Sequence, residues 1–222
     1  MKKVIYVPII HTSADFGSVA SEIEKRIIVQ YGAEKWELHK KAISDFWDSV
    51  SDYFRFLDVK GFKIYQDGLV ADGELGMKIV KMAADSGSKN YLLVYNLVER
   101  GATIMKTEDI NIVKKERDFV VKMAQTKSFI KRLLHYIKYT LYKERLLRQR
   151  DEYIVKMIDE TLKEGETGIV FLGALHNVVA MLPKDIEVIE VKKKEEVVKY
   201  KKQLQKELSF SKKSTGVKRK IV

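Results

Sequence analysis

The chain has 222 residues, of which 45% are hydrophobic, and a formal net charge of +11. This length and composition predict one domain with a substantial core. It contains no cysteine, which excludes disulfides, thiolate catalysis and sulfur-ligated metals. No run approaches the roughly 18 apolar residues of a membrane-spanning helix. We therefore expect a cytoplasmic protein without a membrane partner. The wealth of Lys and Glu resembles the composition of thermophilic proteins.

Most of the positive charge belongs to the C-terminal segment. Residues 192–222 contain twelve Lys or Arg and three acidic residues, a net charge of +9, and the other 191 residues carry about +2. Residues 209–222 are polar and basic, and we predict a flexible tail there. Such a tail can bind nucleic acid or another polyanion without sequence preference.

Short apolar runs alternate with longer helical patterns, which predicts an α/β domain over residues 1–208. We expect a single, mostly parallel sheet of about five strands flanked by helices. The last apolar run alternates with polar residues and suits an edge strand. In chain order the predicted elements are a strand at 4–10, helices at 18–31 and 34–57, a strand at 62–65, helices at 75–84 and 91–100, a strand at 102–105, helical residues 107–162, a strand at 168–172, a helix at 174–182, a strand at 186–191 and a helix at 195–208.

A long helical segment separates the third and fourth predicted strands. Helical character persists from Thr107 to Leu162, and this insertion near 107–163 is well beyond the length of an ordinary globular helix. We therefore expect two or three helices, with a break near Ala124–Ser128. Thr107 is a plausible N-cap, because Glu108 and Asp109 would follow it in the first turn.

Two of the four histidines follow buried runs. His11 lies at the end of the first run, and His176 follows the fourth through Gly173, which permits a tight turn into the first turn of a helix. Ligands of open α/β sheets bind at the carboxyl ends of the strands, so both imidazoles should face one pocket, within about 10 Å of each other. They could bind a divalent metal or transfer protons, or they could be hydrogen-bonded packing residues. His39 and His135 lie within predicted helices and are expected at the surface or at an interface.

Charged residues are predicted at the same edge of the sheet. Asp67 follows the second strand in an Asp-Gly turn, and Glu108 could reach the strand ends, although capping is its alternative role. Arg150 lies on an apolar helix face with Ile154. Such an arginine either pairs with an internal acid such as Asp151 or binds a ligand carboxylate or phosphate.

The common signatures of nucleotide and ester chemistry are missing from the sequence. It contains neither the phosphate-binding pattern G-x-x-x-x-G-K-[ST] nor the dinucleotide pattern G-x-G-x-x-G. The nucleophile elbow G-x-S-x-G and the zinc motif H-E-x-x-H are also missing. Walker-type nucleotide hydrolysis and serine-esterase chemistry therefore lose their usual support.

A histidine after the first strand, the pair Arg150-Asp151 and the G-x-x-H pattern of Gly173–His176 together resemble the TraB/Tiki proteins of the erythromycin-esterase/ChaN-like group. The resemblance implies a site lined by histidines, an arginine and a strand-end acid, and some members are metal-dependent hydrolases or peptidases. The acid expected after the second strand falls on Gln66 or its neighbour Asp67, and with Asp67 the resemblance would make His11, His176 and Asp67 the metal ligands. Pro8 departs from the pattern, because it stands where glycine belongs. Residues 65–69, 90–105 and 166–176 also look like a group of uncharacterised prokaryotic proteins.

Three functions remain open from the sequence. The first is a hydrolase of a small molecule or peptide, in which His11, His176 and Asp67 act as ligands or proton-transfer groups and Arg150 holds an anion. The second is a protein whose basic tail binds nucleic acid or another polyanion. The third is an oligomeric scaffold or small-molecule sensor that uses the tyrosine-rich helix around Tyr136, Tyr139 and Tyr142.

Overall fold

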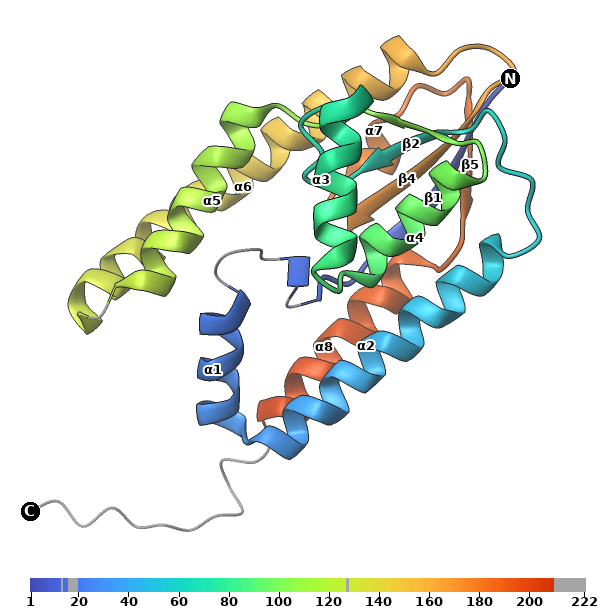
Figure 1. Cartoon of the computed structure of the whole chain (residues 1–222). Coiled ribbons are helices and arrows are strands. Elements are labelled where there is room, and N and C mark those ends of the chain that lie inside the picture. Colours follow the sequence, from blue (N-terminus) through green and yellow to red (C-terminus); the bar gives the residue numbers. More distant parts are fainter. Residues whose placement is uncertain (13, 16–19, 127, 210–222) are drawn as a thin grey trace, which may run out of the picture.

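The fold is a five-stranded parallel sheet covered by helices on both faces (Figure 1). The computed structural model describes residues 1–12, 14–15, 20–126 and 128–209. The strand order is β3-β2-β4-β1-β5, so β4 lies at the centre and β5 at an edge. This confirms the predicted α/β class, the parallel sheet and the edge position of the last strand. The strands are β1 (Lys2–Ile9), β2 (Lys63–Gln66), β3 (Thr103–Met105), β4 (Thr167–Gly173) and β5 (Ile186–Glu190).

The helices follow the predicted order, with shifted ends. Ser88 caps α4 by accepting a hydrogen bond from the backbone N–H of Tyr91, so this helix begins earlier than the apolar pattern indicated. The helices are α1 (Ala20–Tyr31), α2 (Ala33–Phe54), α3 (Gly73–Asp85), α4 (Lys89–Glu99), α5 (Ile110–Gln125), α6 (Phe129–Thr161), α7 (Val178–Met181) and α8 (Lys194–Ser209). None of the described helices is long and apolar enough to cross a membrane.

Each face of the sheet has its own apolar core. Side chains alternate between the two faces of a strand, so Ile5 and Val7 of β1 pack with residues of α2, α3, α4 and α8. Val4 and Tyr6 point the other way and pack with residues of α6 and α7. The central strand is covered on both sides, and this explains why its sequence is apolar without interruption.

The helical insertion is a hairpin of α5 and α6 that extends to one side of the sheet (Figure 1). Its turn confirms the predicted break near Ala124–Ser128. The predicted N-cap is wrong: Asp109 caps α5, because its carboxylate accepts hydrogen bonds from the backbone N–H groups of Asn111 and Ile112. The hydroxyl of Thr107 instead accepts a hydrogen bond from the backbone N–H of Gln66 and donates one to a carbonyl of β3.

Three strands end together and create the edge on which the polar residues gather. In the parallel register, Ile9 of β1 lies opposite Gly173 of β4, and Gln66 of β2 lies opposite Phe171. The residues that follow β1, β2 and β4 therefore leave the sheet side by side. The predicted basic tail lies outside the described residues except for Ser209, which ends α8.

Candidate functional site

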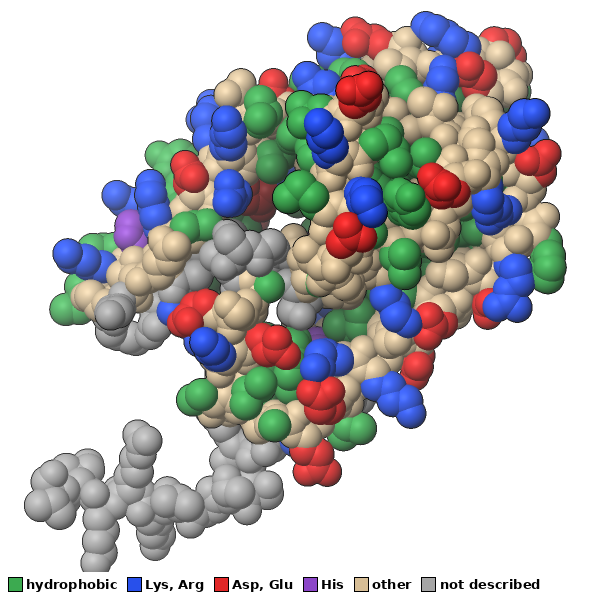
Figure 2. Space-filling view, viewed as in Figure 1, with side chains coloured by type: hydrophobic (Ala, Val, Ile, Leu, Met, Phe, Trp, Pro, Cys, Tyr) green, Lys and Arg blue, Asp and Glu red, His purple; other side chains and the backbone are tan. Residues whose placement is uncertain are grey.

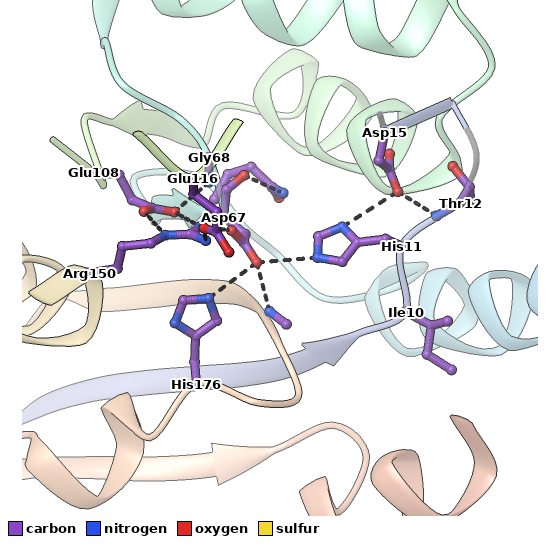
Figure 3. A network of polar contacts seen from close by, with 12 residues as sticks. Ile10, His11, Thr12, Asp15, Asp67, Gly68, Glu108, Glu116, Arg150 and His176 are labelled. Atoms are coloured by element: carbon purple, nitrogen blue, oxygen red, sulfur yellow. Dashed lines mark hydrogen bonds and ion pairs between the residues drawn. The ribbon is translucent and has the colours of Figure 1, made fainter. Parts of the chain in front are cut away.

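Asp67 lies between the two strand-end histidines (Figure 3). The Nε2 atoms of His11 and His176 are each 3.5 Å from the same carboxylate oxygen, Oδ2 of Asp67. The two nitrogens are therefore separated by no more than twice that distance, which confirms the predicted convergence of the imidazoles. The three side chains come from the ends of β1, β2 and β4, as the register of the sheet requires.

Backbone and indole hydrogen bonds hold two of these segments. The backbone N–H of Asp67 donates to the carbonyl of Phe171 at 2.8 Å, which continues the pairing of β2 with β4 by one residue. The buried indole of Trp47 donates to the carbonyl of Ile10 at 3.1 Å, just before His11. The backbone next to Asp67 and His11 is therefore fixed by hydrogen bonds to the sheet and to the core.

His176 lies in a turn and not in the first turn of a helix, which corrects the prediction. Its backbone N–H donates to the carbonyl of Gly173 at 2.9 Å, and α7 begins two residues later. Asp151 explains the delay, because its carboxylate bonds Nδ1 of His176 at 2.5 Å and accepts from the backbone N–H of Asn177 at 2.9 Å. One aspartate of α6 thus fixes both the ring and the chain direction after it.

Each imidazole is flanked by two carboxylates. Nδ1 of His11 faces Asp15 at 3.7 Å, as Nδ1 of His176 faces Asp151, and both rings present Nε2 to Asp67. Burial lowers the pKa of each histidine, but Asp15 and Asp67 raise the pKa of His11 to about 9. Asp151 and Asp67 likewise raise the pKa of His176 to about 9. Both rings are therefore imidazolium cations at neutral pH.

The two rings differ in their access to solvent. The side chain of His11 is 35% exposed, whereas that of His176 is 4% exposed. Only His11 can therefore exchange a proton with a bound molecule or with solvent while the fold stays closed. The buried ring of His176 instead stabilises the negative charge of Asp67 through its Nε2 atom.

Asp67 carries a full negative charge because cations surround it. Burial would raise the pKa of this carboxyl, but hydrogen bonds from His11 and His176 and the charge of Arg150 hold it well below its usual value. Oδ2 also accepts from the backbone N–H of Gly173 at 2.9 Å, and Oδ1 accepts from Arg150 at 2.5 Å. The carboxylate is thus fixed in one orientation.

Internal carboxylates match the charge of Arg150, which decides between the two roles that the sequence left open. Its side chain is 11% exposed and donates two hydrogen bonds to Glu108, at 2.5 and 2.6 Å, and one to Glu116 at 2.5 Å. A further bond reaches Asp67. Asp151, the partner expected from sequence, pairs with His176 instead. Burial raises the pKa of Glu108, which also accepts from the backbone N–H of Gly68.

Two acidic members of this network were missed by sequence reasoning. Asp15 lies four residues after His11, and its other oxygen accepts from the hydroxyl of Ser88. Glu116 lies within α5 and also accepts from the hydroxyl of Tyr139 at 3.2 Å. The only signal for Asp15 was its closeness in sequence to His11. Glu116 gave none, since it is one of several charges on that helix.

Buried polar atoms without partners lie in segments next to this network. Within the described part of the chain, no hydrogen bond reaches Oγ1 of Thr12, Oε1 of Gln66 or either amide atom of Asn90. The side chain of Gln66 is wholly buried and that of Asn90 is 1% exposed. An unsatisfied buried polar atom costs about 1–3 kcal/mol, so such atoms usually meet water or a ligand.

Gly173 brings the backbone close to the three central side chains. A methyl group at this position would lie 3.2 Å from Oδ2 of Asp67, 3.4 Å from Nε2 of His11 and 3.5 Å from Cδ2 of His176. These distances are at or just inside ordinary van der Waals contact. A glycine therefore lets the backbone approach Asp67 closely enough for the N–H of Gly173 to donate to Oδ2, and a side chain here would press on that carboxylate.

The predicted metal ligands are close together but are not arranged as a metal site. Among the described residues, no group of three or more His, Asp and Glu is placed to hold a metal ion. The metal set of His11, His176 and Asp67 remains a prediction of the resemblance.

Comparisons of the chain with protein-family models, curated proteins and solved structures found no significant match. The resemblance to TraB/Tiki proteins therefore stays a prediction.

Replacing Arg150 with methionine should destabilise the protein strongly. The substitution removes the cation that Glu108, Glu116 and Asp67 share and leaves buried carboxylates unpaired, at a cost of about 3–5 kcal/mol. Chemical denaturation at pH 7 measures the loss. The matched control is Arg148→Met, which removes an exposed ion pair to Glu152 and should cost less than about 1 kcal/mol. Equal stability of the two variants would contradict the structural role of Arg150.

The unfolding free energy should fall as the pH rises from about 6.5 to 9. The folded pKa of His176 lies above its ordinary value, so its protonation contributes stability that is fully present below 6.5 and is lost through about 9. Each unit by which the pKa is raised corresponds to about 1.4 kcal/mol, so the protonation of His176 contributes roughly 3 kcal/mol to the unfolding free energy. Asp151→Asn should flatten the dependence, because it removes the carboxylate whose hydrogen bond most raises the pKa of His176. The exposed neighbour substitution Glu152→Gln should leave the slope unchanged, and an unchanged slope in Asp151→Asn would contradict the account.

Proposed function

We propose that the protein is a hydrolase in which His11 transfers a proton at the carboxyl edge of the sheet. One observation carries the proposal: a buried carboxylate lies between the Nε2 atoms of two histidines, one of which, His11, is 35% exposed. Perturbed titratable groups that converge at a strand-end site are typical of catalysis.

The charges assign the acid and the base of the reaction. Protonated His11 is the general acid: its Nε2–H donates a proton to the leaving group as the bond to that group breaks. Asp67 is the general base that accepts a proton from the attacking water. Its low pKa makes it a weak base while both rings are charged. Loss of the proton from His11 removes one of those charges, so the basicity of Asp67 rises within the same step.

The other members of the network position these two groups. Asp151 holds the ring of His176, and this ring and Arg150 hold the carboxylate of Asp67 from two further directions. Fixed orientation of an acid and a base reduces the reorganisation that a reaction requires. Activity should therefore need protonated His11 and should decline as the pH rises through about 9.

Two substitutions test the proposal in different ways. His11→Ala removes the acid and should lower kcat/KM by about 100-fold or more. Gly173→Ala keeps every charged group but places a methyl group 3.2 Å from Oδ2 of Asp67, so it should displace this carboxylate and lower activity. Hydrolysis of p-nitrophenyl acetate, bis-p-nitrophenyl phosphate and fluorogenic peptides provides the measurement, with His135→Ala as the control outside the site.

The outcomes separate the versions of this proposal. Loss of hydrolysis in both site variants, but not in His135→Ala, supports it. Loss of activity on treatment with a chelator, with recovery on adding a divalent metal, would favour the metal-assisted version that the resemblance implies. No hydrolysis of any probe by the wild-type protein, or full activity of His11→Ala, would refute the role of His11.

A further inference from the structure

A hollow lies between α5 and α6, outside the network of Asp67. Its volume is about 330 Å³, within the range of small-molecule sites. Both helices of the hairpin contribute to it, so its shape depends on how they pack. It is lined by Lys115, Phe119, Tyr142, Arg145, Leu146 and Gln149.

The hollow is positively charged because its cations have no acidic partner. Within the described residues, neither Lys115 nor Arg145 forms an ion pair, although they lie on opposite helices of the same hollow. Glu116, next to Lys115 in sequence, is already bound by Arg150 and Tyr139, and Glu144, next to Arg145, does not line the hollow. An anion between Lys115 and Arg145 would relieve their mutual repulsion.

Aromatic and apolar groups form the rest of the wall. The rings of Phe119 and Tyr142 are stacked, with centroids 6.3 Å apart and planes inclined by 19°. Leu146 is 6% exposed, whereas Tyr142 is 50% exposed. The exposed aromatic face offers a stacking surface for a flat ring, and Gln149 adds an amide that makes no hydrogen bond among the described residues.

We propose that this hollow binds a nucleotide, with the base against Tyr142 and Phe119 and the phosphate between Lys115 and Arg145. Two cations beside an aromatic face favour a ligand that combines a flat ring with a phosphate over either alone. Figure 2 shows blue Lys and Arg side chains interspersed with green hydrophobic ones along the hairpin. The surroundings therefore add to the attraction for phosphate.

The same chemistry has two sources: a free nucleotide or a nucleotide within a single strand of nucleic acid. The site does not depend on the proposed hydrolysis, because none of its lining residues touches Asp67, His11 or His176 in the described network. The hydrolase proposal and the nucleotide proposal can therefore fail separately.

Calorimetric titration with 5′-AMP tests the site. The wild-type protein should bind one AMP per chain, and adenosine or inorganic phosphate alone should bind more weakly. Lys115→Met and Arg145→Met should each weaken AMP binding about tenfold or more, as expected for loss of a charged hydrogen bond. The controls are Lys114→Met and Lys143→Met, which remove exposed charges from the same helices but do not line the hollow.

A short oligoadenylate, measured by fluorescence anisotropy, distinguishes the sources. Binding of the oligomer but not of AMP, weakened in Lys115→Met and Arg145→Met, would assign the site to a nucleic-acid strand. The inference is overturned if AMP and oligomer both fail to bind, or if binding is equal in all four variants. His11→Ala should bind AMP as tightly as the wild type, and Lys115→Met should retain any hydrolytic activity.

Discussion

The structure of the strand-end edge depends on one constraint: the buried negative charge of Asp67 must be matched. Three cationic side chains pair with this carboxylate: Arg150 contacts Oδ1, and the two histidines contact Oδ2. A buried charge without such partners would cost several kcal/mol and would instead become neutral. The helix α6, the turn after β4 and the loop after β1 are therefore tied to one carboxylate.

The surrounding acids follow from this constraint. Three cations gathered at one carboxylate would repel each other, so Glu108 and Glu116 share the charge of Arg150, and Asp151 and Asp15 face the outer nitrogens of the rings. The result is an alternating series of carboxylate and imidazole groups. Within it the proton affinity of each member depends on the charge of the next, and this coupling is what the proposed proton transfer uses.

The sequence predicted the position of the candidate site better than it predicted which charged residues pair with each other there. Apolar runs locate the strands, and parallel strands bring their following residues to one edge, so His11, Asp67 and His176 could be grouped in advance. Glu108 could be placed near them for the same reason. These predictions rest on the chain order and on the period of side chains, which the sequence shows directly.

The partners of charged helix residues could not be predicted in the same way. Arg150 and Asp151 are adjacent, but successive helix residues point about 100° apart, so one faces Glu108 and Glu116 and the other faces His176. Which direction each takes depends on the rotation of α6 against the sheet. Glu116 depends in addition on the packing of α5 in the hairpin, and no local pattern reports that packing.

The most direct measurement of the central claim is the protonation state of the two strand-end histidines. Nitrogen-15 NMR of the histidine rings at pH 8 distinguishes an imidazolium, with both nitrogens protonated, from a neutral ring with one. The account predicts imidazolium for His11 and His176, and a neutral His176 in a protein that carries Asp67→Asn and Asp151→Asn. Neutral rings in the wild-type protein at pH 8 would contradict it.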